Sequence, residues 1–238
     1  MNNIDVEANK NIAIIQELEI STKLVKKGLH EFQNISFIND FYFLPILLIS
    51  NGLERFIKII ICLHHFEKNK KYPNLSTIRN YGHNLTRLFD YVFNAFFQSV
   101  DDKPTAVAED LKFLRSKFSK TIITNLSEFG ISARYHYLDE ILGENPKTKP
   151  PETIWHMLEM EIIATEDVNW LKNINSQKYR DKYFVRVREN FVVPIERIMR
   201  ILSRIFTFGY LGENARTFIP SLDPFYSLRD EDLGKTKY

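Results

Sequence analysis

The sequence predicts an all-α protein, an antiparallel helical bundle of about six to eight helices. First, hydrophobic residues recur at helical spacing along most of the 238-residue chain. Second, no stretch alternates apolar and polar residues for long, and no Asn-Gly or Asp-Gly turn joins two runs of strand-forming residues. Third, hydrophobic residues make up 44% of the chain and aromatic residues 13%, which supplies the apolar surface that a packed core requires.

The N-terminal part holds the two longest helical patterns of the first half of the chain. Residues 6–32 form an amphipathic pattern whose apolar positions fall near one face. A second helix is expected to begin near Phe41, with Pro45 tolerated in its first turn. Between residues 47 and 66 apolar side chains occur on nearly every side, which indicates a helix surrounded by other helices.

The middle of the chain predicts shorter helices. A charged connection, residues 67–74, precedes a short helical turn at 75–81, and residues 85–96 then form a helix with one strongly apolar face. Residues 107–129 read as one continuous helix that Gly130 caps. A short helix ending at Gly143 is expected to follow.

The stretch 143–151, GENPKTKPP, is the clearest loop, because three prolines cannot sustain a helix. We therefore expect one domain, in which residues 1–145 form a helical bundle core and residues 146–219 add C-terminal helices packed on the same core. These include a helix over 152–171 and a long helix from about 177 to 211, bent near Pro194. Residues 220–238 are expected to form a polar tail.

Composition and charge exclude several classes. The net charge of +2 provides no global attraction to nucleic acid or to an anionic membrane, so such binding requires a local basic patch. Polar residues interrupt the most apolar region, 41–63, which is therefore too polar to span a membrane. The N-terminus resembles no secretory signal, and the single cysteine, Cys62, lies in an apolar run, so we expect a cytoplasmic protein with an inert thiol.

No motif for a nucleotide cofactor, a serine nucleophile or a zinc protease occurs in the chain. None of the six histidines follows a glutamate by three residues, as helical di-metal centres require. We therefore expect neither a cofactor nor a metal.

One helical face carries the most informative polar residues. Glu54 and Lys58 lie one turn apart in the favourable order for an ion pair. Gly52 removes a side chain just before them and would allow another helix to approach closely, at a propensity cost of about 1 kcal/mol. Two interpretations stay open: an exposed edge with an ion pair of little energetic value, or a partly buried polar cluster.

The residues N-G-L-E-R-x-x-K from Asn51 to Lys58, followed after an interval by G-H-N-L from Gly82 to Leu85, resemble the HEPN superfamily of helical domains. The resemblance covers residues 41–97. It implies an antiparallel helical bundle, frequent homodimerisation, and kinship with bacterial defence and abortive-infection proteins, many of which are ribonucleases. Nuclease members carry an arginine followed, after four to six residues, by a histidine, and pair two such motifs across a dimer.

The arginine and histidine motif is incomplete here. Arg79 precedes His83 with only three residues between them, and Arg134 and His136 are closer still. Arg79 and His83 remain the candidate catalytic residues for metal-independent RNA cleavage, which needs a phosphate clamp and a general acid or base. The alternative interpretation of His83 is structural: a residue at a helix start that hydrogen-bonds to Glu54 or to the backbone.

A second polar group, Arg134, His136 and Asp139, joins Glu54, Lys58 and His83 as candidate site residues. Arginine beside aromatic residues can bind a base and a phosphate, although such groups are more often hydrogen-bond networks between helices. Arg197, Arg200 and Arg204 share one face of the long helix, which we expect to be solvated, with Glu196 available to pair with Arg200.

Three functions compete on this sequence. The first is a non-catalytic, dimeric HEPN-like module in bacterial defence or stress that contacts RNA or a nucleotide. The second is a metal-independent endoribonuclease that uses Arg79 and His83. The third is a purely structural interaction protein.

Overall fold

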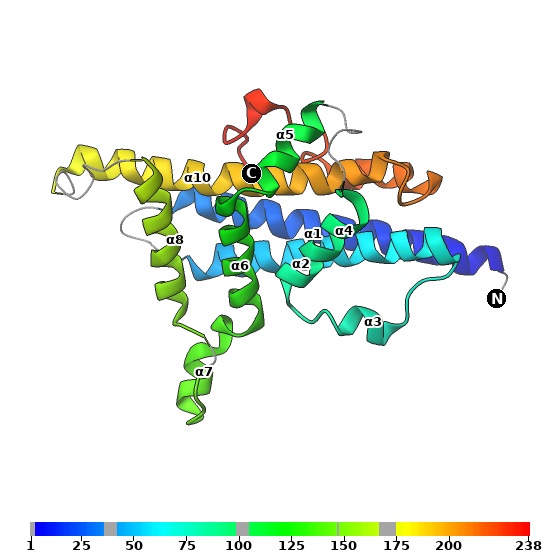
Figure 1. The fold of residues 1–238 in the computed structure, drawn as a ribbon, viewed down its shortest axis with the longest axis horizontal. Helices are drawn as coiled ribbons and strands as arrows, with labels where there is room; N and C mark the ends of the chain where they lie inside the picture. Colours follow the sequence, from blue (N-terminus) through cyan, green and yellow to red (C-terminus); the bar gives the residue numbers. More distant parts are fainter. Residues whose placement is uncertain (1–2, 36–41, 99–104, 147, 167–174) are drawn as a thin grey trace.

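The computed structural model describes residues 3–35, 42–98, 105–146, 148–166 and 175–238, and this part of the chain is all-helical, with no strand (Figure 1). The all-α prediction is therefore confirmed. The described residues form more helices than the six to eight expected, because one predicted helix divides in two and short 3-10 helices follow the long ones. No described helix is both long enough and apolar enough to cross a membrane.

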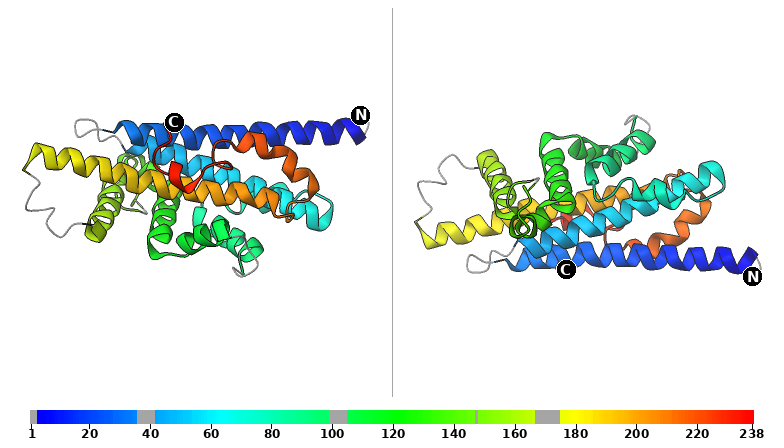
Figure 2. Two further views of the ribbon diagram at one scale, coloured as in Figure 1. Left: turned by 90° about the horizontal axis from the view of Figure 1, so that it is seen from above. Right: turned by 90° about the horizontal axis from the view of Figure 1, so that it is seen from below.

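Three long helices run side by side along the molecule: α1 (Asn3–Asn34), α2 (Phe43–Asn69) and α10 (Gln177–Arg204) (Figures 1 and 2). The short connection between α1 and α2 makes these two helices an antiparallel pair. As predicted, Pro45 lies in the first turn of α2, and the helix is surrounded by others, since Leu53, Phe56, Ile57 and Ile60 are fully buried.

Two glycines bring α1 and α2 into close contact. A Cβ atom on Gly52 would lie 2.6 Å from Val25 Cγ2 and 2.9 Å from the carbonyl oxygen of Ser21. A Cβ atom on Gly28 would lie 2.6 Å from Ile49 Cγ1. All three distances are under 3.0 Å, which is closer than real Cβ atoms approach such neighbours. The helices α1 and α2 can therefore lie this close only because Gly28 and Gly52 have no side chain.

Four helices follow α2 in the chain: α3 (Leu75–Arg79), α4 (Leu85–Phe96), α5 (Thr105–Leu114) and α6 (Lys117–Ile131). Two details differ from the sequence prediction. Residues 107–129 are not one helix, because the Ser116 side chain accepts a hydrogen bond from the Ser119 N–H and caps a new helix. Gly130 does not cap α6 but lies inside it, where its missing Cβ admits the His83 carbonyl oxygen.

The next helices are α7 (His136–Ile141), which follows the 3-10 helix η1 (Ala133–Tyr135), and α8 (Pro151–Glu166). Figure 1 shows α7 projecting from the body of the molecule. Trp155 and Leu158 of α8 are buried as predicted, whereas the expected continuation of this helix to residue 171 lies outside the described residues.

The C-terminal residues pack against the bundle, which differs from the predicted polar tail. After α10 come η2 (Ile205–Thr207), η3 (Glu213–Leu222) and η4 (Asp230–Asp232), and both Leu222 and Phe225 are fully buried. The Tyr238 hydroxyl donates to Glu196 Oε1 at 2.7 Å. Widely spaced apolar residues anchor this segment while the charged residues between them face solvent, a pattern that helical periodicity does not detect.

Candidate functional site

The candidate site lies where α2 meets the connection into α4. Glu54 Oε1 accepts a hydrogen bond from Lys58 Nζ at 2.7 Å, and Glu54 Oε2 lies 2.7 Å from His83 Nδ1. Lys58 Nζ also donates to the Gly82 carbonyl oxygen at 2.8 Å. We call these four residues the Glu54 network. Of the two interpretations from sequence, the structure has the partly buried cluster, because the Glu54 and Lys58 side chains are only 10% and 20% exposed.

Each residue of the G-H-N-L motif has a structural task in this connection. Gly82 adopts a positive φ of 55° and directs its carbonyl toward Lys58. His83 lies one residue before the helix cap, not in the first turn of α4 as the sequence suggested. Asn84 is the cap, since its Oδ1 accepts from the Arg87 N–H at 2.9 Å, and Leu85 is buried.

The residues of the motif on α2, from Asn51 to Lys58, also contact other parts of the bundle. Gly52 fits against α1, and Leu53 is buried in the core. Arg55 Nε pairs with Glu17 Oε1 of α1 at 2.7 Å. The two motifs therefore hold three elements together: α1, α2 and the start of α4.

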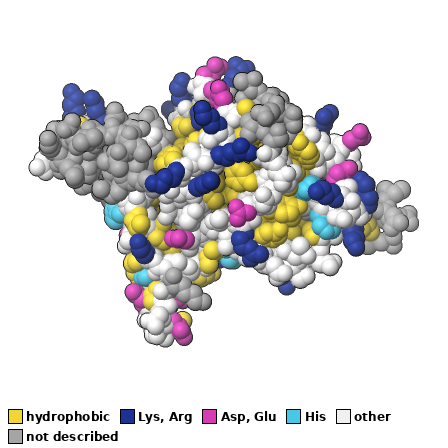
Figure 3. All heavy atoms as spheres, in the orientation of Figure 1, with side chains coloured by type: hydrophobic (Ala, Val, Ile, Leu, Met, Phe, Trp, Pro, Cys, Tyr) yellow, Lys and Arg dark blue, Asp and Glu magenta, His cyan; other side chains and the backbone are white. Residues whose placement is uncertain are grey.

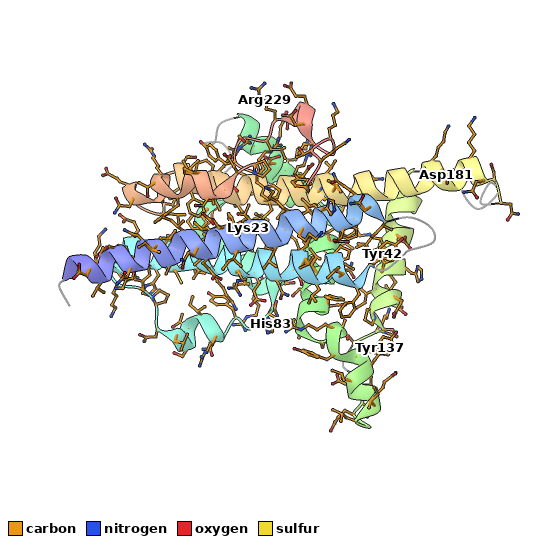
Figure 4. The ribbon with its side chains drawn as sticks, turned by 180° about the vertical axis from the view of Figure 1, so that it is seen from behind. Lys23, Tyr42, His83, Tyr137, Asp181 and Arg229 are labelled. Atoms are coloured by element: carbon orange, nitrogen blue, oxygen red, sulfur yellow. The ribbon has the colours of Figure 1, made fainter. Side chains whose placement is uncertain are left out.

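Among the three side chains of the Glu54 network, that of His83 is the most exposed, at 46%. Figure 4 shows it beside α2, at the surface of the molecule. Because Nδ1 faces the buried Glu54 carboxylate, the ring is held in one orientation, and Nε2 makes no hydrogen bond to any described residue. A carboxylate-oriented imidazole with one free nitrogen has the form of a general acid or base.

The other candidate residues do not join this network. Arg79 is the last residue of α3, and its side chain is exposed. This side chain makes no hydrogen bond or ion pair with another described residue, whereas its backbone carbonyl accepts from the Gly82 N–H. Arg134 lies over the Tyr135 ring at 4.9 Å, and the buried His136 contacts the Thr148 carbonyl oxygen through Nδ1 at 3.0 Å. Asp139 contributes its backbone carbonyl to a turn. These three residues serve η1 and α7 rather than a shared binding site with His83.

Metal and thiol chemistry find little support in the side chains. Among the residues that the structure describes, no group of three or more His, Cys, Asp or Glu side chains could hold a metal ion. Burial raises the pKa of the Cys62 thiol to about 11, which keeps the sulfur protonated and unreactive at neutral pH.

Sequence reasoning missed a buried ion pair. The Arg200 guanidinium, expected on a solvated face, forms two hydrogen bonds to Asp110 of α5, with Nε to Oδ2 at 2.8 Å and Nη2 to Oδ1 at 2.5 Å. Both side chains are at most 2% exposed. Glu196 binds Tyr238 and the Gly234 N–H instead of Arg200. The available signal was the two apolar residues on each side of Arg200, Ile198 and Met199 before it and Ile201 and Leu202 after it.

Two hollows lie away from the Glu54 network. A cavity of about 380 Å³ opens between the start of α1, the end of α2 and residues 211–218, with Glu7, Glu67 and Tyr72 among its lining residues. A groove of about 790 Å³ runs between α6, residues 146–149 and α8.

Compared with models of protein families, with curated proteins and with solved structures, the chain matches none.

Proposed function

We propose that this protein is a non-catalytic HEPN-like helical module that works in bacterial defence or stress as a homodimer and binds RNA or a nucleotide. The observation that carries the non-catalytic part is that the motif residues are engaged in structural contacts. Lys58 is shared between Glu54 and the Gly82 carbonyl, and Asn84 caps α4. A buried carboxylate that is paired and hydrogen-bonded in this way stabilises helix packing and needs no catalytic role to explain its presence.

A local basic surface supports RNA as the ligand. Between Leu111 and Ser127 there is no acidic residue, and four exposed basic side chains occur there. Arg197 of α10 adds a guanidinium that lies 5.3 Å from the ring centre of Phe113. Figure 3 shows Lys and Arg side chains in the upper part of this face, along α10 and above it. Such a surface attracts phosphates even though the net charge of the chain is close to zero. The basic side chains between Leu111 and Ser127 are Lys112, Arg115, Lys117 and Lys120.

Reversing two of these charges is expected to weaken RNA binding. We expect the double variant Lys117→Glu/Lys120→Glu to bind a fluorescent single-stranded RNA at least about tenfold more weakly at low salt. The slope of log K against log salt should become shallower by about 1.4, since two phosphate contacts are lost. Fluorescence anisotropy over a salt series measures both quantities.

The matched control is Lys23→Glu/Lys27→Glu on α1, which changes the net charge by the same amount at exposed positions. Equal weakening by both double variants would show that binding follows net charge and not this surface. Retention of wild-type affinity by the α5–α6 variant would exclude the surface altogether.

The metal-independent endoribonuclease remains a second candidate because of one observation, the half-exposed His83 with Nδ1 held by Glu54. In that reaction His83 would take the proton of a ribose 2′-hydroxyl, whose oxygen attacks the adjacent phosphorus. The bond from phosphorus to the 5′-oxygen breaks, this oxygen leaves with a proton from water, and a 2′,3′-cyclic phosphate remains. An arginine would stabilise the negative charge on the phosphoryl oxygens. Arg79 is the candidate for that role, although its side chain does not contact His83.

Incubation with total RNA in the presence of a metal chelator separates the two candidates. We expect the wild-type protein and the His83→Ala variant to leave the RNA equally intact, because the nearby Lys58 ammonium is already bound to Glu54 and to the Gly82 carbonyl, and Arg79 does not contact His83. The control is His156→Ala, which removes a histidine that also faces a glutamate, with Nδ1 3.0 Å from Glu159 Oε2. Cleavage by the wild type and by His156→Ala, but not by His83→Ala, would establish the nuclease and refute the non-catalytic proposal.

A further inference from the structure

The exposed hydrophobic side chains of the described residues concentrate on one part of the molecule. Within residues 131–142, six large hydrophobic residues are exposed, and Met157 of α8 is a seventh. Ile141 and Leu142 are the most exposed, at 78% and 74%. We call this set the α7 patch; its members are Ile131, Tyr135, Tyr137, Leu138, Ile141, Leu142 and Met157.

The α7 patch stands on a braced projection and not on a loose loop (Figures 1 and 4). His136 Nδ1 faces the Thr148 carbonyl at 3.0 Å, which ties α7 to the returning chain. The Tyr137 hydroxyl donates to Glu152 Oε2 at 2.5 Å, which ties it to α8. We call this projection, residues 136–142, the α7 ridge. Because the α7 ridge is already ordered, it loses little conformational entropy on binding.

A concave surface lies directly beside this ridge. The apolar part of the 790 Å³ groove comes from α6, the loop before α8 and α8 itself, namely Ile131, Pro146, Ile154 and Met157, and its polar lining includes Glu128 and Lys149. Ile131 and Met157 belong both to the groove and to the α7 patch. One molecule therefore presents an apolar ridge and an apolar groove next to each other.

We propose that the occupant of each groove is the α7 ridge of a second copy of this chain. A two-fold axis that places one ridge in the partner's groove automatically places the partner's ridge in the first groove, so a single contact closes the dimer. This inference rests on the proposed function only in that the module acts as a dimer; it names the surface that forms the interface.

The exposed area agrees with a dimer interface. Seven large side chains at these exposures offer on the order of 800 Å², which is about what each partner buries in a protein interface of standard size. The largest apolar patch of a typical monomer is smaller, about 300–600 Å². An uncovered patch of this size on a protein that acts alone would favour aggregation.

Charge also suits this pairing. Lys149 lines the groove, and its ammonium group contacts the Met157 sulfur at 3.2 Å but no carboxylate of a described residue. Glu144 is exposed just after the ridge. A ridge seated in the partner's groove brings the Glu144 carboxylate to Lys149, which pairs with no carboxylate among the described residues, although Glu128 lines the same groove.

Analytical ultracentrifugation of the full chain tests the interface. We expect the wild type to be a dimer, and Ile141→Asp/Leu142→Asp to dimerise more than about 100-fold more weakly, because the dimer would bury the new carboxylates in apolar surroundings. Both positions are exposed, so the helical circular dichroism should stay unchanged, while the melting temperature should fall only by the stabilisation that the dimer contributes. The control Ile12→Asp/Ile20→Asp, at exposed positions of α1, should remain dimeric.

Heterologous cross-linking distinguishes ridge-in-groove pairing from other dimers. A protein with Leu142→Cys is mixed with a tagged protein with Met157→Cys and oxidised; we expect a covalent heterodimer that the pair Lys23→Cys with Met157→Cys does not give. A monomeric wild type, or a dimer that survives the two aspartates or gives no heterodimer, would overturn the inference. A monomeric wild type would also refute the homodimer of the proposed function, whereas failure of the aspartate variant or of the cross-link would overturn this interface alone. None of these outcomes depends on whether RNA is cleaved or bound.

Discussion

Replacing Asp110 by alanine is expected to lower the free energy of unfolding by about 3–5 kcal/mol. The variant leaves the Arg200 guanidinium buried between α5 and α10, where Asp110 supplies two of its hydrogen bonds. Arg204 also loses its contact to Asp110 at 3.3 Å. The remaining carboxylate, Asp230, is largely exposed to solvent and compensates only part of the charge. Urea denaturation followed by circular dichroism measures the loss.

The double variant Asp110→Leu/Arg200→Met tests whether the loss comes from an unpaired buried charge. Removing both partners leaves no isolated charge, so we expect most of the lost stability to return. As a control, Asp90→Ala on the exposed surface of α4 should change the unfolding free energy by no more than about 0.5 kcal/mol. A single variant that costs less than about 1 kcal/mol would contradict the burial of this pair.

Replacing Gly52 by valine is expected to destabilise the protein by about 3 kcal/mol or more, with alanine causing a smaller loss. The Cβ atom meets the backbone oxygen of Ser21 at 2.9 Å and the stiff, β-branched side chain of Val25 at 2.6 Å. Neither the Ser21 carbonyl nor the Val25 side chain can move away by a simple rotation. The helices α1 and α2 must therefore move apart to admit the new side chain. This outweighs the gain of about 1 kcal/mol in helix propensity that alanine brings.

Thermal and urea denaturation of both Gly52 variants, of a surface control and of a double variant test this prediction. Lys68→Val, at an exposed position of α2, should stay within about 0.5 kcal/mol of the wild type. Val25→Ala should reduce the additional cost of Gly52→Ala, because the nearest atom is removed, so the two changes should be less than additive. A Gly52→Ala protein that is more stable than the wild type would show that propensity alone governs this position.

Much of the fold follows from local patterns. The apolar face of α4 was visible in the spacing of Leu85, Leu88, Phe89, Val92 and Phe96, and all of these residues are buried. The division between α5 and α6 was not visible, because apolar residues keep their helical phase across the break and Ser116 is a cap only when the chain turns there. Periodicity shows which face of a helix is buried, not where a cap interrupts it.

The candidate site, too, could be predicted only in part from the sequence. The helical order of Glu54 and Lys58 and the role of Gly52 could be inferred from their spacing along one helix. The sequence also suggested the hydrogen bond between His83 and Glu54, which are 29 residues apart, but not the exposure of the imidazole. The exposure of His83 depends on which elements pack against it, such as α6 at Gly130, and the spacing of residues along one helix carries no information about this.

The sequence by itself determined an all-α protein, the buried faces of α1 and α4 and the residues that join α2 to the start of α4. Only the tertiary structure decided that Arg200 is paired with Asp110, 90 residues away, that the C-terminal segment is packed, and that α7 stands out as an apolar ridge. The physical reason is that helix formation and amphipathicity depend on neighbours in the chain, whereas the burial of a charge or the exposure of an apolar face depends on which helices meet.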